Sequence, residues 1–123
     1  MTTKAIEVKQ ADKFFGKWGK RTQVLHGVEL DISEGEAFGF VGANGAGKST
    51  TIKIIMDIIR ADGGSASIFG IDSRDPRARL GMSYVPENPY LYDYLTPYEL
   101  LRMGVMQHRL DVPDIKKHCY QWL

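Results

Sequence analysis

Short segments in which apolar and polar residues alternate open the chain. Residues 6–8 alternate in this way, and a longer alternation covers residues 28–32. A period of two is typical of strands that bury one face, and it favours antiparallel pairing. Residues 37–41 form an apolar run, which predicts a central parallel strand buried on both faces. A short strand over residues 65–69 and a core strand over residues 82–85 are also predicted.

Helical patterns follow two of these strands. Residues 51–60 place polar side chains at a helix-like spacing within an apolar segment. A second helix is predicted over residues 99–110, because Thr96 suits the N-cap, Pro97 suits the first helical position, and a glutamate stands three residues after the cap. Residues 115–123 form a last helical segment with apolar residues on roughly one face. The chain therefore passes from a mixed α/β region into a helical one.

A glycine-rich segment separates the apolar run from the first helix. Residues 42–50 read GANGAGKST, with two glycines separated by four residues and followed by lysine and serine. Between a strand and a helix, this pattern predicts a loop whose backbone N–H groups bind phosphate oxygens. We expect Lys48 to reach the β- and γ-phosphates of a nucleoside triphosphate and Ser49 to ligate Mg²⁺. The candidate phosphate-binding residues are Gly42, Asn44, Gly45, Ala46, Gly47, Lys48, Ser49 and Thr50.

The composition of the chain bears on which classes of partner are expected. The 123 residues carry 16 Lys and Arg against 15 Asp and Glu, for a formal net charge of +1. This balance gives no argument for a polyanionic partner, and no nucleic-acid partner is predicted. Cys119 is the only cysteine, which rules out an internal disulfide, suits a reducing cytosol and predicts a small, partly buried apolar side chain.

Neither a signal peptide nor a membrane span is predicted. The first residues lack an apolar core, and the most apolar segment, residues 52–59, is short and contains Lys53 and Asp57. If the protein works at a membrane, we expect another polypeptide to supply the span.

Residues 13–21 are basic and aromatic and contain two glycines. Three interpretations are open from the residues alone: a nucleic-acid-binding loop, the tip of a hairpin, or an aromatic side chain that stacks on the base of a nucleotide.

The glycine-rich loop, in the form of residues 44–51, resembles that of ATP-binding cassette (ABC) proteins. Other features agree in order and spacing. Phe15, followed by glycine, resembles the adenine-stacking aromatic position, and residues 28–36 resemble the strand and turn that lead to the loop. Residues 84–88 and 91–100 resemble the Q-loop and the opening of the helical subdomain. The resemblance covers essentially the whole chain and is specific for the family, whereas the glycine-rich loop alone indicates only the superfamily.

The resemblance implies an α/β fold, the first half of a P-loop NTPase core with an N-terminal antiparallel β-subdomain and the start of a helical subdomain. The implied division is residues 1–36 for the antiparallel part, residues 37–88 for the core and residues 89–123 for the helical part.

The resemblance also assigns roles to residues outside the loop. Phe15 is expected to stack on adenine, in preference to Phe14 or Trp18. Glu87 stands at the Q-loop position, where most of the family has glutamine, and resembles the branch that includes two-component exporters. One interpretation gives Glu87 a metal-contacting role beside Ser49, and the other leaves it as a solvated loop carboxylate.

Several motifs of the family are expected downstream of this segment: the signature loop, the Walker B aspartate with the adjacent catalytic glutamate, and the switch histidine. His26, His108 and His118 do not stand in the switch context. The chain therefore resembles the N-terminal half of a nucleotide-binding domain. No catalytic residue is expected within it, and we expect nucleotide binding at best and no ATP turnover by these residues alone.

The resemblance implies an ATP-binding subunit of an ABC transporter, most like an exporter, with ATP and Mg²⁺ as cofactors. Its implied partners are a second nucleotide-binding subunit and a membrane permease, which would hold it at the cytoplasmic face of the membrane. The alternative is an ABC ATPase without a permease, associated with translation or repair. A third interpretation, a metabolic kinase, is disfavoured by the antiparallel strands and by residues 84–100.

A group of tyrosines has two interpretations, contact with the permease or packing under a loop: Tyr90, Tyr92 and Tyr94.

Overall fold

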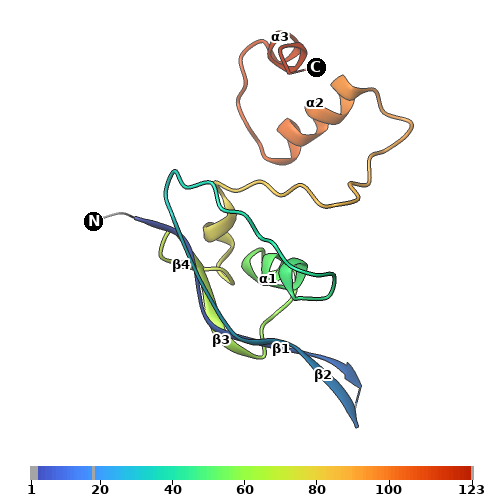
Figure 1. Ribbon diagram of the computed structural model, residues 1–123. Helices are drawn as coiled ribbons and strands as arrows, with labels where there is room; N and C mark the ends of the chain where they lie inside the picture. Colours follow the sequence, from blue (N-terminus) through green and yellow to red (C-terminus); the bar gives the residue numbers. More distant parts are fainter. Residues whose placement is uncertain (1–2, 18, 123) are drawn as a thin grey trace. The chain divides into compact units, whose positions relative to one another are not determined.

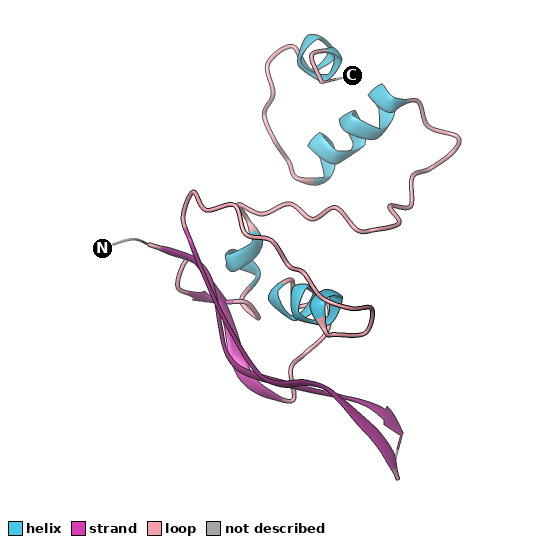
Figure 2. Cartoon of the chain, in the orientation of Figure 1, coloured by secondary structure: helices cyan, strands magenta, loops and turns pink. Residues whose placement is uncertain are grey.

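The computed structural model describes residues 3–17 and 19–122, which form two compact units. The first unit ends at Ser83 and the second begins at Tyr84. Among the described residues, the first unit contains a β-sheet and the helix after the glycine-rich loop, whereas the second contains helices joined by loops (Figure 1 and Figure 2). The sequence-based division at residues 36 and 88 stays a prediction.

The sheet of the first unit is built around a long hairpin. β1 (Lys4–Lys17) pairs antiparallel with β2 (Lys20–Ser33) on one edge and with β3 (Gly63–Ile68) on the other. The short β4 (Ile71–Asp72) follows, so that the described strands are ordered β2-β1-β3-β4 (Figure 1). The antiparallel pairing predicted from the alternating segments is confirmed, and the strand predicted over residues 65–69 corresponds to β3.

One face of this sheet carries the apolar core of the first unit. α1 (Lys48–Ile55) packs on that face and buries Thr51, Ile54 and Ile55. A 3-10 turn (Pro76–Arg79) adds Ala78 to the same core. The buried apolar side chains of the cluster are Val8, Ala11, Leu25, Leu30, Ile54, Ile55, Ala66, Ile68 and Ala78.

α1 is shorter than the helix predicted over residues 51–60. It ends at Ile55, with Met56 as its C-cap, and Asp57 adopts a left-handed backbone conformation with φ of 54°. This conformation turns the chain away from the helix axis, because a left-handed residue cannot continue a right-handed helix.

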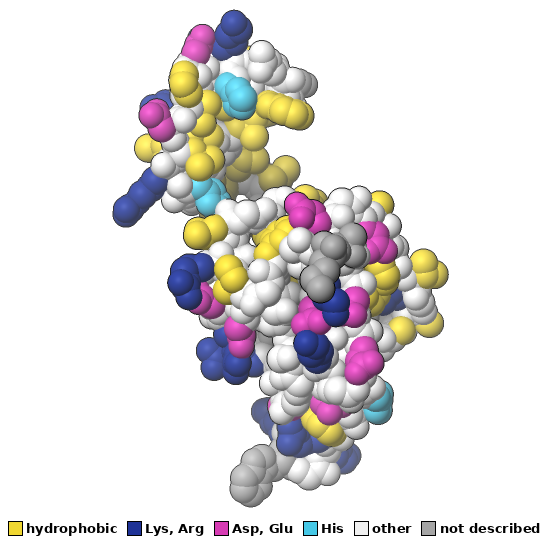
Figure 3. All heavy atoms as spheres, turned by 90° about the vertical axis from the view of Figure 1, so that its left-hand side faces the viewer, with side chains coloured by type: hydrophobic (Ala, Val, Ile, Leu, Met, Phe, Trp, Pro, Cys, Tyr) yellow, Lys and Arg dark blue, Asp and Glu magenta, His cyan; other side chains and the backbone are white. Residues whose placement is uncertain are grey.

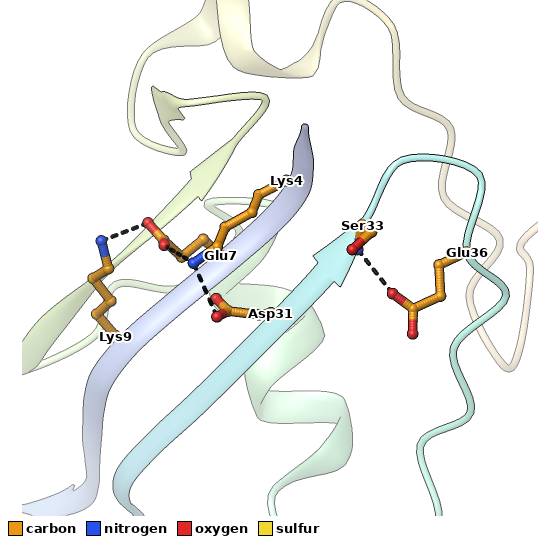
Figure 4. Close-up of polar contacts among 6 residues, drawn as sticks. All are labelled: Lys4, Glu7, Lys9, Asp31, Ser33 and Glu36. Atoms are coloured by element: carbon orange, nitrogen blue, oxygen red, sulfur yellow. Dashed lines mark hydrogen bonds and ion pairs between the residues drawn. The ribbon is translucent and has the colours of Figure 1, made fainter. Parts of the chain in front are cut away.

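The outer face of the hairpin is charged (Figure 4). Lys4 Nζ lies 2.6 Å from Glu7 Oε1 and 2.9 Å from Asp31 Oδ2, and Lys9 Nζ lies 2.7 Å from Glu7 Oε2. Hydrogen bonds from Lys4 and Lys9 lower the pKa of Glu7, and those to Glu7 and Asp31 raise the pKa of Lys4. The face of the first unit seen in Figure 3 likewise mixes basic and acidic side chains, with no large area of one sign.

The two predicted core strands, residues 37–41 and 82–85, are wrong as strands. Neither segment belongs to a sheet, and Val41 and Val85 are 95% and 82% exposed. Residues 37–41 have no regular secondary structure, and the rings of Phe38 and Phe40 contact edge to face. A central strand needs a hydrogen-bonded neighbour on each edge, and no strand within the described residues pairs with either segment. The apolar pattern therefore identified residues suited to a core but not the pairing that would bury them.

The second unit contains α2 (Pro97–Gln107) and α3 (Ile115–Tyr120). The predicted capping box of α2 is confirmed, since Thr96 Oγ1 accepts from the Glu99 amide and Glu99 Oε2 accepts from the Thr96 amide at 2.8 Å. The Thr96 amide and hydroxyl hold the pKa of Glu99 below its usual value. Cys119 is buried, as expected of a small apolar side chain. None of the helices in the described part of the chain is long and apolar enough to cross a membrane.

Replacing a valine with serine should have opposite consequences at two positions of the first unit. Val8→Ser should lower the free energy of unfolding by about 1.5–3 kcal/mol, because Val8 is 1% exposed. Val41→Ser should leave it within about 0.5 kcal/mol and reduce binding of a hydrophobic dye, because Val41 is 95% exposed. Urea unfolding followed by circular dichroism, with dye fluorescence in parallel, measures both. Equal losses of stability would show that residues 37–41 are packed in solution.

Candidate functional site

The glycine-rich loop forms a tight turn that leads into α1. The Ala46 amide donates to the Ala43 carbonyl at 3.1 Å. Gly45 and Gly47 have φ values of 85° and 91°, in the left-handed region that favours glycine. Gly47 is the N-cap of α1, so the helix begins at Lys48, earlier than the predicted start at residue 51.

Gly47 also allows the loop to lie directly against β2. A Cβ atom at this position would stand 2.4 Å from Leu25 Cδ2 and 3.2 Å from the Val24 carbonyl oxygen. Leu25 is itself 2% exposed. The N-terminal end of α1 is therefore fixed on the hairpin by a contact that no larger residue would permit.

Thr51 fixes the first turn of α1 from within the core. It is 1% exposed, and both its amide and its hydroxyl donate to the Gly47 carbonyl oxygen at 2.9 Å. The turn after the loop is thus held without help from solvent.

The N-terminal end of α1 presents free hydrogen-bond donors. The amides of Lys48, Ser49 and Thr50 occupy the first helical turn, where no carbonyl of the same helix is available to accept from them. Gly47 offers no side-chain cap, and the first turn contains no acidic residue. Together with the partial positive charge of a helix N-terminus, these amides suit an anion such as phosphate.

Lys48 folds back over the loop that precedes it. Its Nζ donates to the Gly42 carbonyl and, at 2.8 Å, to the Ala43 carbonyl. The ammonium group has three N–H donors, and the acceptors of these two hydrogen bonds are uncharged carbonyl oxygens. A phosphate oxygen would accept more strongly than a carbonyl, because a hydrogen bond between two charged groups is the stronger one.

The hairpin places Phe15 on the same side of the sheet as the loop. Lys13 is opposite Leu25 in the β1–β2 ladder, so the side chains of this pair share a face. Phe15 follows two residues later and returns to that face. Its side chain is 43% exposed, with Lys13 Nζ 5.4 Å from the ring centroid. The face that carries Leu25, and therefore Gly47, also carries Phe15.

Phe14 is engaged differently. Its amide donates to Asp62 Oδ2 at 2.8 Å, and the Arg21 guanidinium lies 5.0 Å from the centroid of its ring. Trp18, the third aromatic residue weighed for base stacking, lies outside the described residues.

The two predicted metal-contacting residues belong to different units. Ser49 is exposed at the start of α1 in the first unit, and Glu87 is exposed in a loop of the second unit. Their joint role stays a prediction. Within the described residues no group of three His, Cys, Asp or Glu side chains is placed to hold a metal ion.

Asp62 is a residue of the site region that the sequence did not single out. In the sequence it stands directly before two glycines, yet its side chain contacts the backbone of Phe14, 48 residues away. A carboxylate beside two glycines is the expected signal of a turn, and nothing in the local pattern identifies so distant a partner.

A glycine-rich loop followed directly by a helix that begins at its lysine is the feature of P-loop nucleotide-binding folds, although residues 37–41 before the loop do not pair as a strand here. A family model described as ABC transporter matches residues 25–122. The chain belongs to the ABC transporter family.

Curated relatives support the same conclusion. The chain is 36% identical over 99 residues to an ABC transporter ATP-binding protein of Synechocystis, covering 78% of this chain and 28% of the relative. It is 36% identical over 112 residues to the Nod factor export ATP-binding protein I of Azorhizobium caulinodans, covering 86% and 34%. It is 33% identical over 116 residues to the linearmycin resistance ATP-binding protein LnrL of Bacillus subtilis, covering 93% and 37%. The chain thus spans about a third of the length of these relatives.

Solved structures show the same fold. The chain is 37% identical to an ATP-binding subunit of an ABC transporter, with a TM-score of 0.73. The match covers 87% of this chain and 44% of that structure. A dimeric ATP-binding cassette bound to ADP and Pi superposes with a TM-score of 0.81 at 22% identity, over 94% of this chain and 54% of that one. The second likeness shows the fold alone.

Two glycines of the loop should respond differently to alanine. Gly45→Ala should lower the free energy of unfolding by about 1 kcal/mol, because φ is positive there but nothing lies within 4 Å of a new Cβ. Gly47→Ala should lower it by about 1–3 kcal/mol more, because its Cβ would overlap Leu25. Chemical unfolding of both variants measures the difference. Equal effects would mean that the loop does not rest on β2.

Proposed function

We propose that this chain binds ATP and forms part of the ATP-binding subunit of an ABC transporter that couples ATP binding and hydrolysis to transport through a separate permease. The observation that carries the proposal is Lys48, held over a glycine-rich turn whose next three amides lack helical acceptors. This arrangement concentrates positive charge and N–H donors at one place, as a triphosphate requires.

Binding of the phosphates replaces contacts that the loop already makes. The Lys48 ammonium exchanges the Gly42 and Ala43 carbonyls for β- and γ-phosphate oxygens. The amides of the first turn of α1 donate to the phosphates. The Ser49 hydroxyl, exposed beside them, supplies an oxygen that fits Mg²⁺, with Glu87 as the proposed second contact. Mg²⁺ neutralises charge on the phosphates when bound.

Phe15 is the proposed contact to the base. It lies on the face of the hairpin that carries the loop and is 43% exposed, and an aromatic ring stacks on any base. Phe14 is the weaker candidate, because it directly precedes Phe15 in β1 and therefore faces the opposite side of the hairpin from the loop.

The transporter role and its direction rest on the relatives. One matched protein is named for Nod factor export and another for linearmycin resistance, and Glu87 at the Q-loop position resembles the exporter branch. A second ATP-binding subunit is the other proposed partner, as the family resemblance implies. The whole protein would hydrolyse ATP and be held at the cytoplasmic face of the membrane by its permease. Phosphoryl transfer in such proteins depends mainly on positioning and charge stabilisation.

Replacing Lys48 should weaken ATP binding. Lys48→Ala removes a charge-assisted contact to phosphate, worth about 1.5–3 kcal/mol, and should lower affinity about ten- to a hundredfold. Lys53→Ala, on the exposed side of the same helix, is the matched control and should bind as the unmodified chain does. Titration of a fluorescent ATP analogue measures both. Unchanged affinity in Lys48→Ala would remove the basis of the proposed function.

Replacing Phe15 should discriminate between ligands. Phe15→Ala should weaken binding of ATP by about 1–3 kcal/mol and leave inorganic triphosphate unaffected, because stacking acts on the base. Phe14→Ala and Trp18→Ala test the alternative aromatics under the same conditions. Competition titrations with both ligands give the comparison. If Phe15→Ala weakens both ligands equally, Phe15 only packs the hairpin, and if Phe14→Ala alone is selective, the stacking residue is Phe14.

A further inference from the structure

The part of the hairpin that carries Phe15 extends beyond the sheet. β3 pairs with β1 from Ile6 as far as Asp12, and within the described residues no third strand continues past that point (Figure 1). Residues 13–17 of β1 are therefore paired only with β2. A ribbon of two strands is marginally stable in water, so the position of its aromatic residues depends on additional contacts.

Asp62 supplies contacts at the base of this ribbon. It lies in the connection between α1 and β3, where its amide donates to the Asp12 carbonyl at 2.9 Å. Its Oδ2 accepts from the Phe14 amide at 2.8 Å and lies 3.2 Å from Lys13 Nζ. Its Oδ1 lies 3.5 Å from an Arg21 guanidinium nitrogen. One carboxylate thus joins both strands of the ribbon to the segment that follows α1.

Each cation bound by Asp62 also lies over an aromatic ring. Lys13 Nζ is 5.4 Å from the centroid of Phe15, and Arg21 Cζ is 5.0 Å from the centroid of Phe14. The attraction between a cation and the face of a ring adds to the ion pair, so the carboxylate restrains the two rings through the two cations. Basic and apolar side chains meet at this end of the hairpin, the lower end in Figure 3.

We propose that Asp62 is a positioning residue for the nucleotide base: by binding the Phe14 amide, Lys13 and Arg21, it holds Phe15 in the place where it stacks. This inference rests on the proposed function, because it assumes that Phe15 contacts the base of ATP. Asp62 itself touches no phosphate in this scheme. It acts by restricting the hairpin before the ligand arrives, which reduces the ordering that binding would otherwise require.

The electrostatics of Asp62 agree with this role. Two hydrogen bonds lower the pKa of its carboxyl below the usual value: the one from the Phe14 amide has the larger effect and the one from Lys13 the smaller. The carboxylate is therefore charged at neutral pH, as its ion pairs with Lys13 and Arg21 require.

The contacts of Asp62 can be tested without a ligand. In Asp62→Ala, hydrogen exchange at the Phe14 amide should accelerate about three- to tenfold, the scale of one net hydrogen bond. Asp75→Ala is the matched control, because Asp75 also accepts a backbone amide, that of Arg77 at 2.9 Å, and pairs with a guanidinium, but its partner belongs to the 3-10 turn and not to the hairpin. Its Phe14 exchange rate should equal that of the unmodified chain. An unchanged rate in Asp62→Ala would overturn the proposal.

The positioning role is tested by ligand selectivity. Asp62→Ala should weaken ATP binding about three- to tenfold while inorganic triphosphate binds as before, and Asp75→Ala should change neither. Asp62→Glu, which keeps the charge, should recover part of the loss. In a Phe15→Ala background, Asp62→Ala should cause no further loss, because its effect passes through Phe15.

The outcomes separate the two proposals. If the unmodified chain binds ATP and Asp62→Ala weakens both ligands equally, or if the losses of Asp62→Ala and Phe15→Ala add, the positioning role is overturned and the proposed function stands. If the unmodified chain binds neither ligand, the proposed function fails and the positioning role fails with it, whereas the exchange rate of Phe14 still reports whether Asp62 restrains the hairpin.

Discussion

The contact between Gly47 and Leu25 is the constraint on which the first unit depends. It brings the N-terminal end of α1 against the hairpin, at a distance that only a glycine permits. The contact fixes the direction of α1 and thereby the place to which its first amides point. It also sets the separation between the loop, which is proposed to bind phosphate, and the ribbon, which carries the aromatic residues. The positions of both the loop and the ribbon therefore depend on the contact between Gly47 and Leu25.

The sequence predicted the features whose cause is local. The capping box of α2 could be predicted because Thr96 and Glu99 satisfy each other within one turn. A helix after the glycine-rich loop could be predicted because residues 51–60 show a helix-like spacing, although α1 begins earlier, at Lys48. The antiparallel strands could be predicted from the alternation of apolar and polar residues, because that pattern depends only on which face of a strand is exposed to solvent. The family, too, could be identified from short segments in the correct order.

Features that depend on distant partners could not be predicted. The apolar run at residues 37–41 was interpreted as a central strand, but a strand requires a neighbour to pair with, and the pattern of one segment does not supply it. Asp62 illustrates the converse, since a residue typical of a turn binds an amide 48 positions earlier. β2 has a bulge at Val24, because Lys13 is opposite Leu25 whereas Phe14 is opposite Gln23. No residue pattern in the sequence indicates this bulge.

The position of Lys48 has a consequence for how the loop recognises its ligand. Lys48 Nζ bridges two carbonyls of the loop, so the loop contains a cation of its own that organises it. These contacts hold the turn without a ligand, which reduces the ordering that the proposed binding of nucleotide would require. In the proposed function, recognition is a replacement of carbonyl partners by phosphate oxygens around the Lys48 ammonium. Selectivity then arises from the difference between a carbonyl and a phosphate as acceptors, and a neutral ligand of the same size would gain little from entering.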